Sequence, residues 1–363
     1  MALLILEGYP FRWLFVALCD VSAANGRTNY GQAKVVSPAL QGRGCFALCR
    51  VELGRVESIL SALRGNKLRL IVVNADDFGI SEGVNRGIVE AHRRGILTST
   101  TLMANMPAFE QAVALSRENP GLGVGLHLNL TAGAPIIPTS EVPTLVGEDG
   151  RFLLGGVFLR QLTLGRLNLR EVEAELGAQI ERAQGLGIAP THLDSHHHIH
   201  IHPALQPVAI DLALRYGIGG IRSTVEFGLA DGVGQVGMLL RGIREGERET
   251  VRGRYLKAVV LSVLGRLLQV RARRAGLATP SYFRGLLLGM AFGPTSLHRL
   301  LRSLPDGSTE LMCHPGYLDE GLKKETSYSV GRDSELRALI DPVSSEILSE
   351  RTVRPARYSD LTR

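Results

Sequence analysis

The fold is decided by the stretch 68–79, which reads Leu68-Arg69-Leu70-Ile71-Val72-Val73-Asn74-Ala75-Asp76-Asp77-Phe78-Gly79. Its first half is apolar and rich in β-branched residues, which is typical of a buried strand. Asp76 and Asp77 follow at the strand end. Neighbouring side chains of an extended segment point to opposite sides, so one carboxylate could bind a metal while the other acts beside it as a base. The structural alternative is a turn aspartate followed by a helix N-cap.

The sequence after this stretch alternates between expected helices and strands. Ser81 is a candidate N-cap, and Gly95 a candidate end, for the first helix. Further strands are expected at 98–103, 122–128, 191–194, 218–222 and 310–313, and helices at 107–117, 168–185 and 203–216. This alternation favours a parallel sheet with right-handed crossovers. In α/β barrels and open sheets alike, the functional site lies where the strands end.

Six of the ten histidines lie within the segment 191–203, which reads THLDSHHHIHIHP. If the run stayed extended, its even-numbered residues would share one face: His192, Asp194, His196, His198, His200 and His202. Crowded imidazoles are costly to protonate, and neutral imidazole is a common metal ligand. Metal binding is therefore favoured over a natural histidine tract. A purification tag would not be interrupted by Leu, Asp and Ile.

Further polar residues follow the other expected strands. His127 lies within Gly125–Asn129, and His314 within Met312–Gly316. A lone histidine at a strand end, such as His127, is often structural. The titration range of histidine suits a general acid at His314, for which a helix-start or loop histidine is the alternative. Arg222 could orient a carboxylate or a substrate oxygen, and a surface arginine is the alternative. The residues predicted to bind substrate are Arg222, Asn129, His198 and His200.

The composition is that of an ordinary globular protein, with 363 residues, 45% hydrophobic and 21% charged. The net charge is +6, and ten Lys/Arg face three Glu between Arg241 and Arg274. This basic excess could attract nucleic acid or an anionic membrane surface. A solvated helix face is the preferred interpretation, and the scarcity of aromatic side chains there argues against a nucleic-acid partner.

The chain has no serine-esterase elbow, Walker A or dinucleotide motif in a strand-to-helix context. This argues against a serine esterase, a phosphoryl transferase or a dehydrogenase.

Residues 1–66 have no clear period and no motif. We interpret them as an N-terminal extension, poorly ordered or from an over-long gene start, before a catalytic domain at 67–363 with a basic helical insert at about 237–275. No apolar run approaches the roughly 20 residues of a membrane helix, and Trp13–Cys19 is only faintly like a signal peptide. Four scattered cysteines suit a reducing compartment, so the prediction is a cytoplasmic protein without an integral membrane span.

These motifs resemble the YdjC/ChbG carbohydrate deacetylases, a group that also includes the hopanoid-associated deacetylase HpnK. The resemblance covers roughly Lys67–Leu322, and its matching pieces are Asn74–Gly79, Gly125–Leu128, Thr191–His202 and Cys313–Gly316. It implies an α/β fold, a deformed (β/α) TIM-like barrel with mostly parallel strands and the active site at their C-terminal ends. It also implies a homodimer that removes acetyl groups from N-acetylated sugars.

Residue by residue, the resemblance implies Asp77, His127 and His196 as metal ligands, Asp76 as the base that activates water, and His314 as the acid. It implies Mg²⁺, whereas histidine-rich ligation alone suggests Zn²⁺. One carboxylate and two imidazoles leave open positions on a divalent ion, which is typical of a catalytic site.

The leading hypothesis is therefore a metal-dependent hydrolase acting on an N-acetylated sugar or oligosaccharide, of chitooligosaccharide or glycolipid type. The form Asp194-Ser195-His196 is closer to the chitooligosaccharide branch. A non-catalytic metal- or sugar-binding protein is an alternative, but it leaves Asp76 and His314 without a role. A metallophosphatase, the third possibility, would need more carboxylates and usually two metals.

Overall fold

The computed structural model describes residues 69–226, 248–288, 292–326, 328, 331–350 and 353–361, together with three short strands nearer the N-terminus. Residue contacts divide the chain into two units, Met1–Lys67 and Leu68–Arg363. The first unit contains an antiparallel sheet of β1 (Phe15–Ala17), β2 (Ala33–Val36) and β3 (Arg50–Val51). The interpretation of residues 1–66 as an extension remains a prediction. The part of the basic insert before Arg248 lies outside the described residues.

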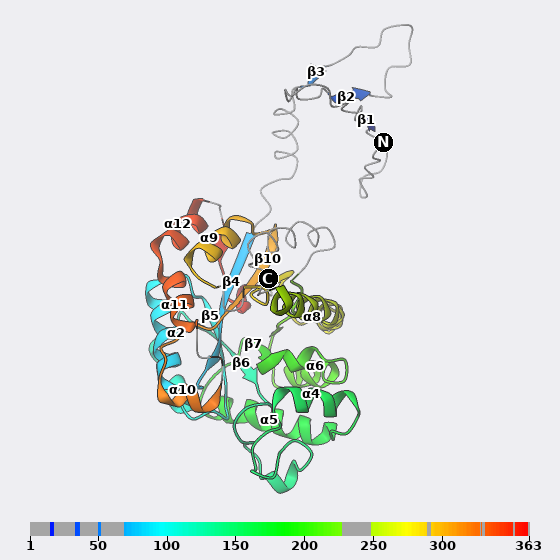
Figure 1. Ribbon diagram of the computed structural model, residues 1–363, viewed down its shortest axis with the longest axis vertical. Coiled ribbons are helices and arrows are strands. Elements are labelled where there is room, and N and C mark those ends of the chain that lie inside the picture. The colour runs from blue at the N-terminus through cyan, green and yellow to red at the C-terminus, as the bar shows by residue number, and fades with distance from the viewer. Residues whose placement is uncertain are drawn as a thin grey trace. The chain divides into compact units, whose positions relative to one another are not determined.

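The second unit is built on a parallel sheet (Figure 1). Its strands lie in the order β8-β7-β6-β5-β4-β10-β9, and β11 also pairs with β4. The strands are β4 (Arg69–Phe78), β5 (Ser99–Leu102), β6 (Gly123–Leu128), β7 (His192–Ser195), β8 (Gly220–Ile221), β9 (Tyr282–Arg284), β10 (Gly307–Cys313) and β11 (Val353–Pro355). Because all of these pairings are parallel, the carboxyl ends of the strands meet at one rim.

Backbone hydrogen bonds join the two edges of this sheet. Gly220 forms a parallel bridge with Ala278. The Ile221 amide donates to the Ala278 carbonyl at 2.9 Å, and the Phe283 amide donates to the Val225 carbonyl at 2.9 Å. The sheet thus curls into a barrel with a short, irregular seam. The predicted fold class, a deformed (β/α) barrel with mostly parallel strands, is confirmed.

Helices cover the outer face of the sheet (Figure 1). They are α2 (Glu82–Arg94), α3 (Phe109–Glu118), α4 (Gly155–Thr163), α5 (Leu169–Gly185), α6 (Gln206–Arg215), α8 (Arg248–Arg274), α9 (Pro294–Arg302), α10 (Glu320–Glu325), α11 (Arg332–Ile340) and α12 (Pro342–Glu350). Ser81 caps α2, as predicted, by accepting from the Val84 amide, and Gly95 is its C-cap. No helix in the described ranges is long and apolar enough to cross a membrane.

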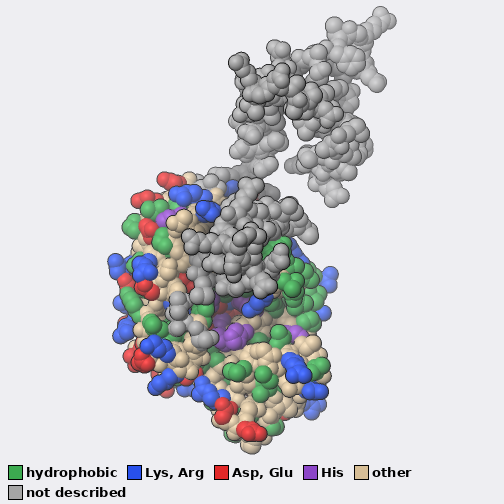
Figure 2. Space-filling view, viewed as in Figure 1, with side chains coloured by type: hydrophobic (Ala, Val, Ile, Leu, Met, Phe, Trp, Pro, Cys, Tyr) green, Lys and Arg blue, Asp and Glu red, His purple; other side chains and the backbone are tan. Residues whose placement is uncertain are grey.

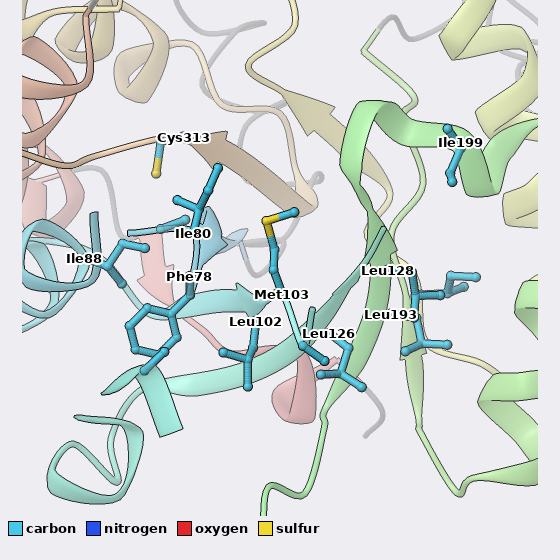
Figure 3. Packing of buried hydrophobic residues seen from close by; sticks show 14 of the residues in the cluster. Phe78, Ile80, Ile88, Leu102, Met103, Leu126, Leu128, Leu193, Ile199 and Cys313 are labelled. Carbon is cyan, nitrogen blue, oxygen red and sulfur yellow. The ribbon is translucent and has the colours of Figure 1, made fainter. Parts of the chain in front are cut away.

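The alternation of side chains along β4 separates the core from the site. Ile71, Val73 and Ala75 pack in the main hydrophobic cluster, together with residues from the neighbouring strands β5, β6 and β7 (Figure 3). Val72 packs with Tyr358 in a second cluster. Successive side chains of a strand alternate between its faces, so Asn74 and Asp76 follow Val72 on the face opposite the main core. The carboxyl end of β4 therefore carries polar groups that are buried and need partners.

Candidate functional site

A cavity of about 270 Å³ opens at the carboxyl ends of β4, β6, β7 and β10. Figure 2 shows histidine side chains gathered near the middle of the face in view. The lining residues from the strand ends and the histidine run are Asp76, Asp77, His127, His196, His197, His198, Met312 and His314. The lining from other segments is Lys257, Gly285, Leu286, Phe292, Thr326, Tyr328, Arg332 and Glu335. The structure thus brings together all five residues predicted as ligands or catalytic groups, and their roles remain proposals.

The two neighbouring aspartates reach the same cavity because the backbone leaves the extended conformation between them. Asp77 has a φ of 68°, and the pairing of β4 with β5 shifts register between Ala75 and Phe78. The left-handed region is strained for residues with a side chain, and aspartate is among those that tolerate it best. The expectation that Asp76 and Asp77 point to opposite sides was wrong, because this bulge turns Asp77 towards the cavity.

Asp77, His127 and His196 form the candidate metal centre. Each offers one ligand atom, and the three atoms lie within 4.8 Å of one another. Asp77 Oδ1 is 3.6 Å from His127 Nε2 and 3.4 Å from His196 Nδ1. This oxygen is buried and has no hydrogen-bond partner, although buried polar atoms are normally paired. A divalent cation between the three atoms would satisfy it, so the residues fit a metal.

Two further residues fix the orientation and charge of these ligands. Arg332 Nη2 lies 2.6 Å from Asp77 Oδ2. Burial raises the pKa of Asp77, but Arg332 and His196 outweigh it and hold the pKa well below its usual range. His127 Nδ1 lies 2.8 Å from Asp194 Oδ1, which leaves Nε2 facing Asp77. A carboxylate behind a ligating imidazole is the usual support of a metal site.

His127 is strongly basic in the metal-free protein. Burial lowers the pKa of His127, but the nearby carboxylates, Asp194 foremost, raise it to about 9. Thr101 Oγ1 donates to Asp194 Oδ2 at 3.1 Å, which helps to hold that carboxylate in place. The imidazole of His127 thus lies in a negative environment that would equally favour a bound cation.

Arg222 is completely buried and contacts three carboxylates. Its guanidinium donates to both oxygens of Asp76 at 2.6 and 2.7 Å. It also lies 2.6 Å from Asp194 Oδ2 and 2.8 Å from Glu310 Oε1. Burial raises the pKa of Asp76, but Arg222 and His127 together lower it below its usual range. Asp76 is therefore an ionised carboxylate held in one orientation.

A second group of close ligand atoms consists of Asp76, His127 and Asp194. Arg222 Nη1 contacts Oδ2 of both carboxylates of this group, at 2.7 Å from Asp76 and 2.6 Å from Asp194. The guanidinium already supplies positive charge there. This second group is therefore explained by Arg222 and needs no metal.

The histidine run does not stay extended beyond β7. The 3₁₀ segment η2 (His196–Ile201) begins directly after it, and His197 and His198 have φ values of 57° and 58°. The expectation that six even-numbered side chains share one face was therefore wrong. The turn instead brings His196, His197 and His198 together at the cavity.

Two histidines of the run, His192 and His200, are buried against other protein groups. His192 stacks on Tyr358 with ring centroids 3.6 Å apart. His200 lies 2.6 Å from Ser195 Oγ through Nδ1 and 3.1 Å from the Arg222 carbonyl through Nε2. Burial lowers the pKa of His192 to about 3 and that of His200 to about 4. Both imidazoles are therefore neutral at neutral pH.

Of the four residues predicted to bind substrate, His198 lines the cavity, and its Nδ1 atom has no hydrogen-bond partner. Arg222, Asn129 and His200 are not among the described residues of the lining. Asn129 Nδ2 donates to the Ala132 carbonyl at 2.7 Å, and Asn129 Oδ1 accepts from the Thr131 amide at 3.0 Å. Direct substrate contact by these three stays a prediction, and their polar atoms bond to protein groups in this structure.

His314 follows β10, whose Cys313 pairs with Ala75 of β4, and it also contacts groups of helix α11 and the segment before it. Its backbone amide donates to Glu335 Oε2 at 2.6 Å, and Tyr328 Oη donates to Glu335 Oε1 at 2.9 Å. Burial lowers the pKa of His314 to about 4, although Asp77 and Asp76 act in the other direction. Burial raises the pKa of Glu335 to about 7. Sequence reasoning missed Glu335, Tyr328 and Arg332, because no strand end marks them.

The family model of the YdjC-like proteins matches residues 70–350 of this chain. The chain belongs to the YdjC-like protein family. A carbohydrate deacetylase of Geobacillus stearothermophilus is 36% identical over 293 residues, which cover 80% of this chain and 98% of that protein. A chitooligosaccharide deacetylase of Salmonella typhimurium is 33% identical, over 81% of this chain and 99% of that protein.

A solved structure shows the same fold. The crystal structure of a protein from Enterococcus faecalis V583, described in terms of cellobiose-phosphate cleavage, matches with a TM-score of 0.63 and 30% identity. The match covers 81% of this chain and 99% of that one. All described residues that line the cavity lie within the part of the chain that matches the YdjC-like family.

Proposed function

We propose that this protein is a metal-dependent hydrolase that removes the acetyl group from N-acetylated carbohydrates. Family relatives named as carbohydrate and chitooligosaccharide deacetylases support the reaction and the sugar substrate. The observation that carries the metal dependence is Asp77 Oδ1, a buried oxygen without a hydrogen bond that faces one nitrogen from each of two imidazoles. The position of this group at a strand-end cavity suits a catalytic role.

A divalent cation would be held by Asp77, His127 and His196. When bound, it would polarise the acetyl carbonyl and lower the pKa of water, the usual chemistry of such a site. The resemblance favours Mg²⁺ and the two imidazoles favour Zn²⁺, so the proposal is a divalent ion without a fixed identity.

Asp76 is the proposed base. Its carboxylate is ionised, because Arg222 lowers its pKa, and the bidentate pair fixes its position at the cavity wall. A carboxylate of low pKa is a weak base. Asp76 can therefore accept a proton only from a water molecule whose own pKa has been lowered in the site.

His314 is the proposed acid that protonates the departing nitrogen. In the free protein its pKa of about 4 makes it neutral at pH 7. The imidazole must therefore first take up a proton from solvent, which negative charge developing on the bound acetyl group favours, and then transfer that proton to the departing nitrogen. The backbone bond to Glu335 fixes the position of this residue at the cavity wall.

Acetate release from N-acetylglucosamine oligomers, with and without chelator, tests the proposal. We expect turnover that is lost in chelator and restored by added Mg²⁺ or Zn²⁺. Asp77→Asn and His196→Ala should abolish both metal binding and acetate release. His202→Ala is the matched control, since His202 belongs to the same run but not to the described lining.

Each alternative gives a different result in the same assay. Full activity in Asp77→Asn would refute the metal centre. Metal binding without acetate release from any acetylated sugar would identify a binding protein. Phosphate release from sugar phosphates in place of acetate would identify a phosphatase. The cytoplasmic location and the homodimer stay predictions, the second of which sedimentation analysis can check.

A further inference from the structure

Helix α8 presents an apolar stripe to solvent. Its members follow one another by four and three residues in turn: Leu256, Val260, Val263, Leu267 and Val270. Leu256 and Val263 are 64% and 65% exposed. The helix packs on the barrel through its other side, where Ala258, Leu268 and Ala272 are buried. The stripe is therefore not the surface by which α8 joins the fold, and a continuous exposed row of aliphatic side chains marks an interaction surface.

Basic side chains flank this stripe on both sides. With 3.6 residues per turn, Lys257 and Arg271 lie on one side of it and Arg266 and Arg273 on the other, and all four are exposed. Within the part of the chain that the structure describes, none of the four forms an ion pair, and the three arginines bond to neutral groups. The sequence contains no Asp or Glu from Thr250 to Pro305. The surface of α8 thus combines an apolar row with unneutralised positive charge.

We propose that α8 is a docking surface for an anionic lipid bilayer. A helix with an aliphatic row between basic side chains lies in the membrane interface, with the row among the upper acyl chains and the basic groups at the lipid phosphates. The opposite charges of α8 and of the anionic head groups select this partner.

Two other occupants fit the surface less well. A second copy of α8 would bring two strips of like charge together, which opposes association. A protein partner usually binds through aromatic anchors seated in pockets, whereas the stripe is an aliphatic ridge. A fluid bilayer can take up the stripe without a pocket that matches its shape.

The docking surface begins at the rim of the catalytic cavity. Lys257 belongs to α8 and also lines the cavity. Hydrophobic side chains over α8 lie beside the histidine group in the same view (Figure 2). Docking would therefore bring the cavity close to the lipid surface. The inference does not depend on deacetylation, since binding to lipid is measured without any substrate.

Co-sedimentation of the full chain with lipid vesicles tests the proposal. One set of vesicles contains phosphatidylcholine alone, and the other contains about 30% phosphatidylglycerol. We expect partitioning that is at least about tenfold greater onto the anionic vesicles and that weakens as salt screens the charges. Val263→Asp should lower this partitioning by about tenfold, because it places a carboxylate in the middle of the stripe.

The matched control is Leu318→Asp, since Leu318 is 55% exposed and lies next to α10. Circular dichroism and the midpoint of thermal unfolding establish that both variants fold. Absence of binding to anionic vesicles, or an equal effect of Val263→Asp and Leu318→Asp, would overturn the proposal. A dimer that Val263→Asp dissociates, in a protein that does not bind vesicles, would overturn it too and assign the stripe to a second copy.

Discussion

At the scale of single residues, the candidate site includes a carboxylate that does not line the cavity but supports a residue that does. Asp194 holds His127 in the orientation that points Nε2 towards Asp77. Asp194 also accepts from Arg222. If Asp194 is replaced by an uncharged residue, Arg222 still contacts the carboxylates of Asp76 and Glu310. The role of Asp194 at the candidate metal centre can therefore be tested without removing every partner of the buried guanidinium.

We expect Asp194→Asn to lower metal affinity by about 10- to 100-fold, the usual cost of losing a carboxylate behind a ligating histidine. Isothermal titration of the apoprotein with Zn²⁺ measures the effect. Glu175→Gln is the control, because Glu175 is also a buried carboxyl but bonds to the amides of Ile136 and Ile137. Unchanged affinity in Asp194→Asn would show that the carboxylate does not act through His127.

The sequence predicted the side chains of the site better than the backbone that presents them. The predicted site residues lie at strand ends: Asp76 and Asp77 at the end of β4, His127 near the end of β6, and His196 and His314 directly after β7 and β10. The left-handed backbone at Asp77 and at two residues of the histidine run could not be predicted, because it is imposed by strand pairing and cavity packing. Local preference alone favours an extended chain for such residues. Strain of this kind is typical of functional sites.

At the scale of elements, helix α2 positions the segment that carries His314. Two glycines four residues apart, Gly83 and Gly87, lie on one side of α2. A Cβ atom on Gly87 would lie 2.5 Å from the Cα of Gly316, and one on Gly83 would lie 2.5 Å from the Tyr317 carbonyl oxygen. The helix can approach this segment closely only because these side chains are absent.

Gly87→Ala should therefore destabilise the protein, although alanine is the better helix former. The clash is with backbone, which cannot rotate away, so we expect a loss of about 1–3 kcal/mol in the free energy of unfolding. We also expect acetate release to fall, because His314 would move. Gly253→Ala in α8 meets no atom within 4 Å and should be neutral or slightly stabilising. Urea unfolding measures the free energy of unfolding of both variants. Equal changes in the two would contradict the proposed close packing at Gly87.

At the scale of the whole molecule, the barrel closes where its two edges meet. Glu226 follows the seam bond of Val225, and its carboxylate accepts from the amides of Gly285 and Leu286, two cavity-lining residues. The alternation of strands and helices did not distinguish a closed barrel from an open sheet, and the barrel was predicted only from the family resemblance. The seam is made by single bridges and side-chain bonds between segments far apart in the chain, and no local pattern encodes them. The same limit hid Arg332 and Glu335, which reach the cavity through the packing of α11.

Glu226 gives the seam a pH dependence. Burial raises its pKa to about 7, although Arg284 acts in the opposite direction. A carboxyl whose pKa is raised from 4.5 on folding stabilises the fold fully below pH 4.5, and the contribution is lost as the pH rises through 7. Between pH 5 and pH 8 wild type should therefore lose about 2 kcal/mol more unfolding free energy than Glu226→Gln, whose amide does not titrate. Urea unfolding at both pH values measures this difference. Parallel losses in the two proteins would show that Glu226 is already ionised in the folded barrel, and that its hydrogen bonds to the seam outweigh its burial.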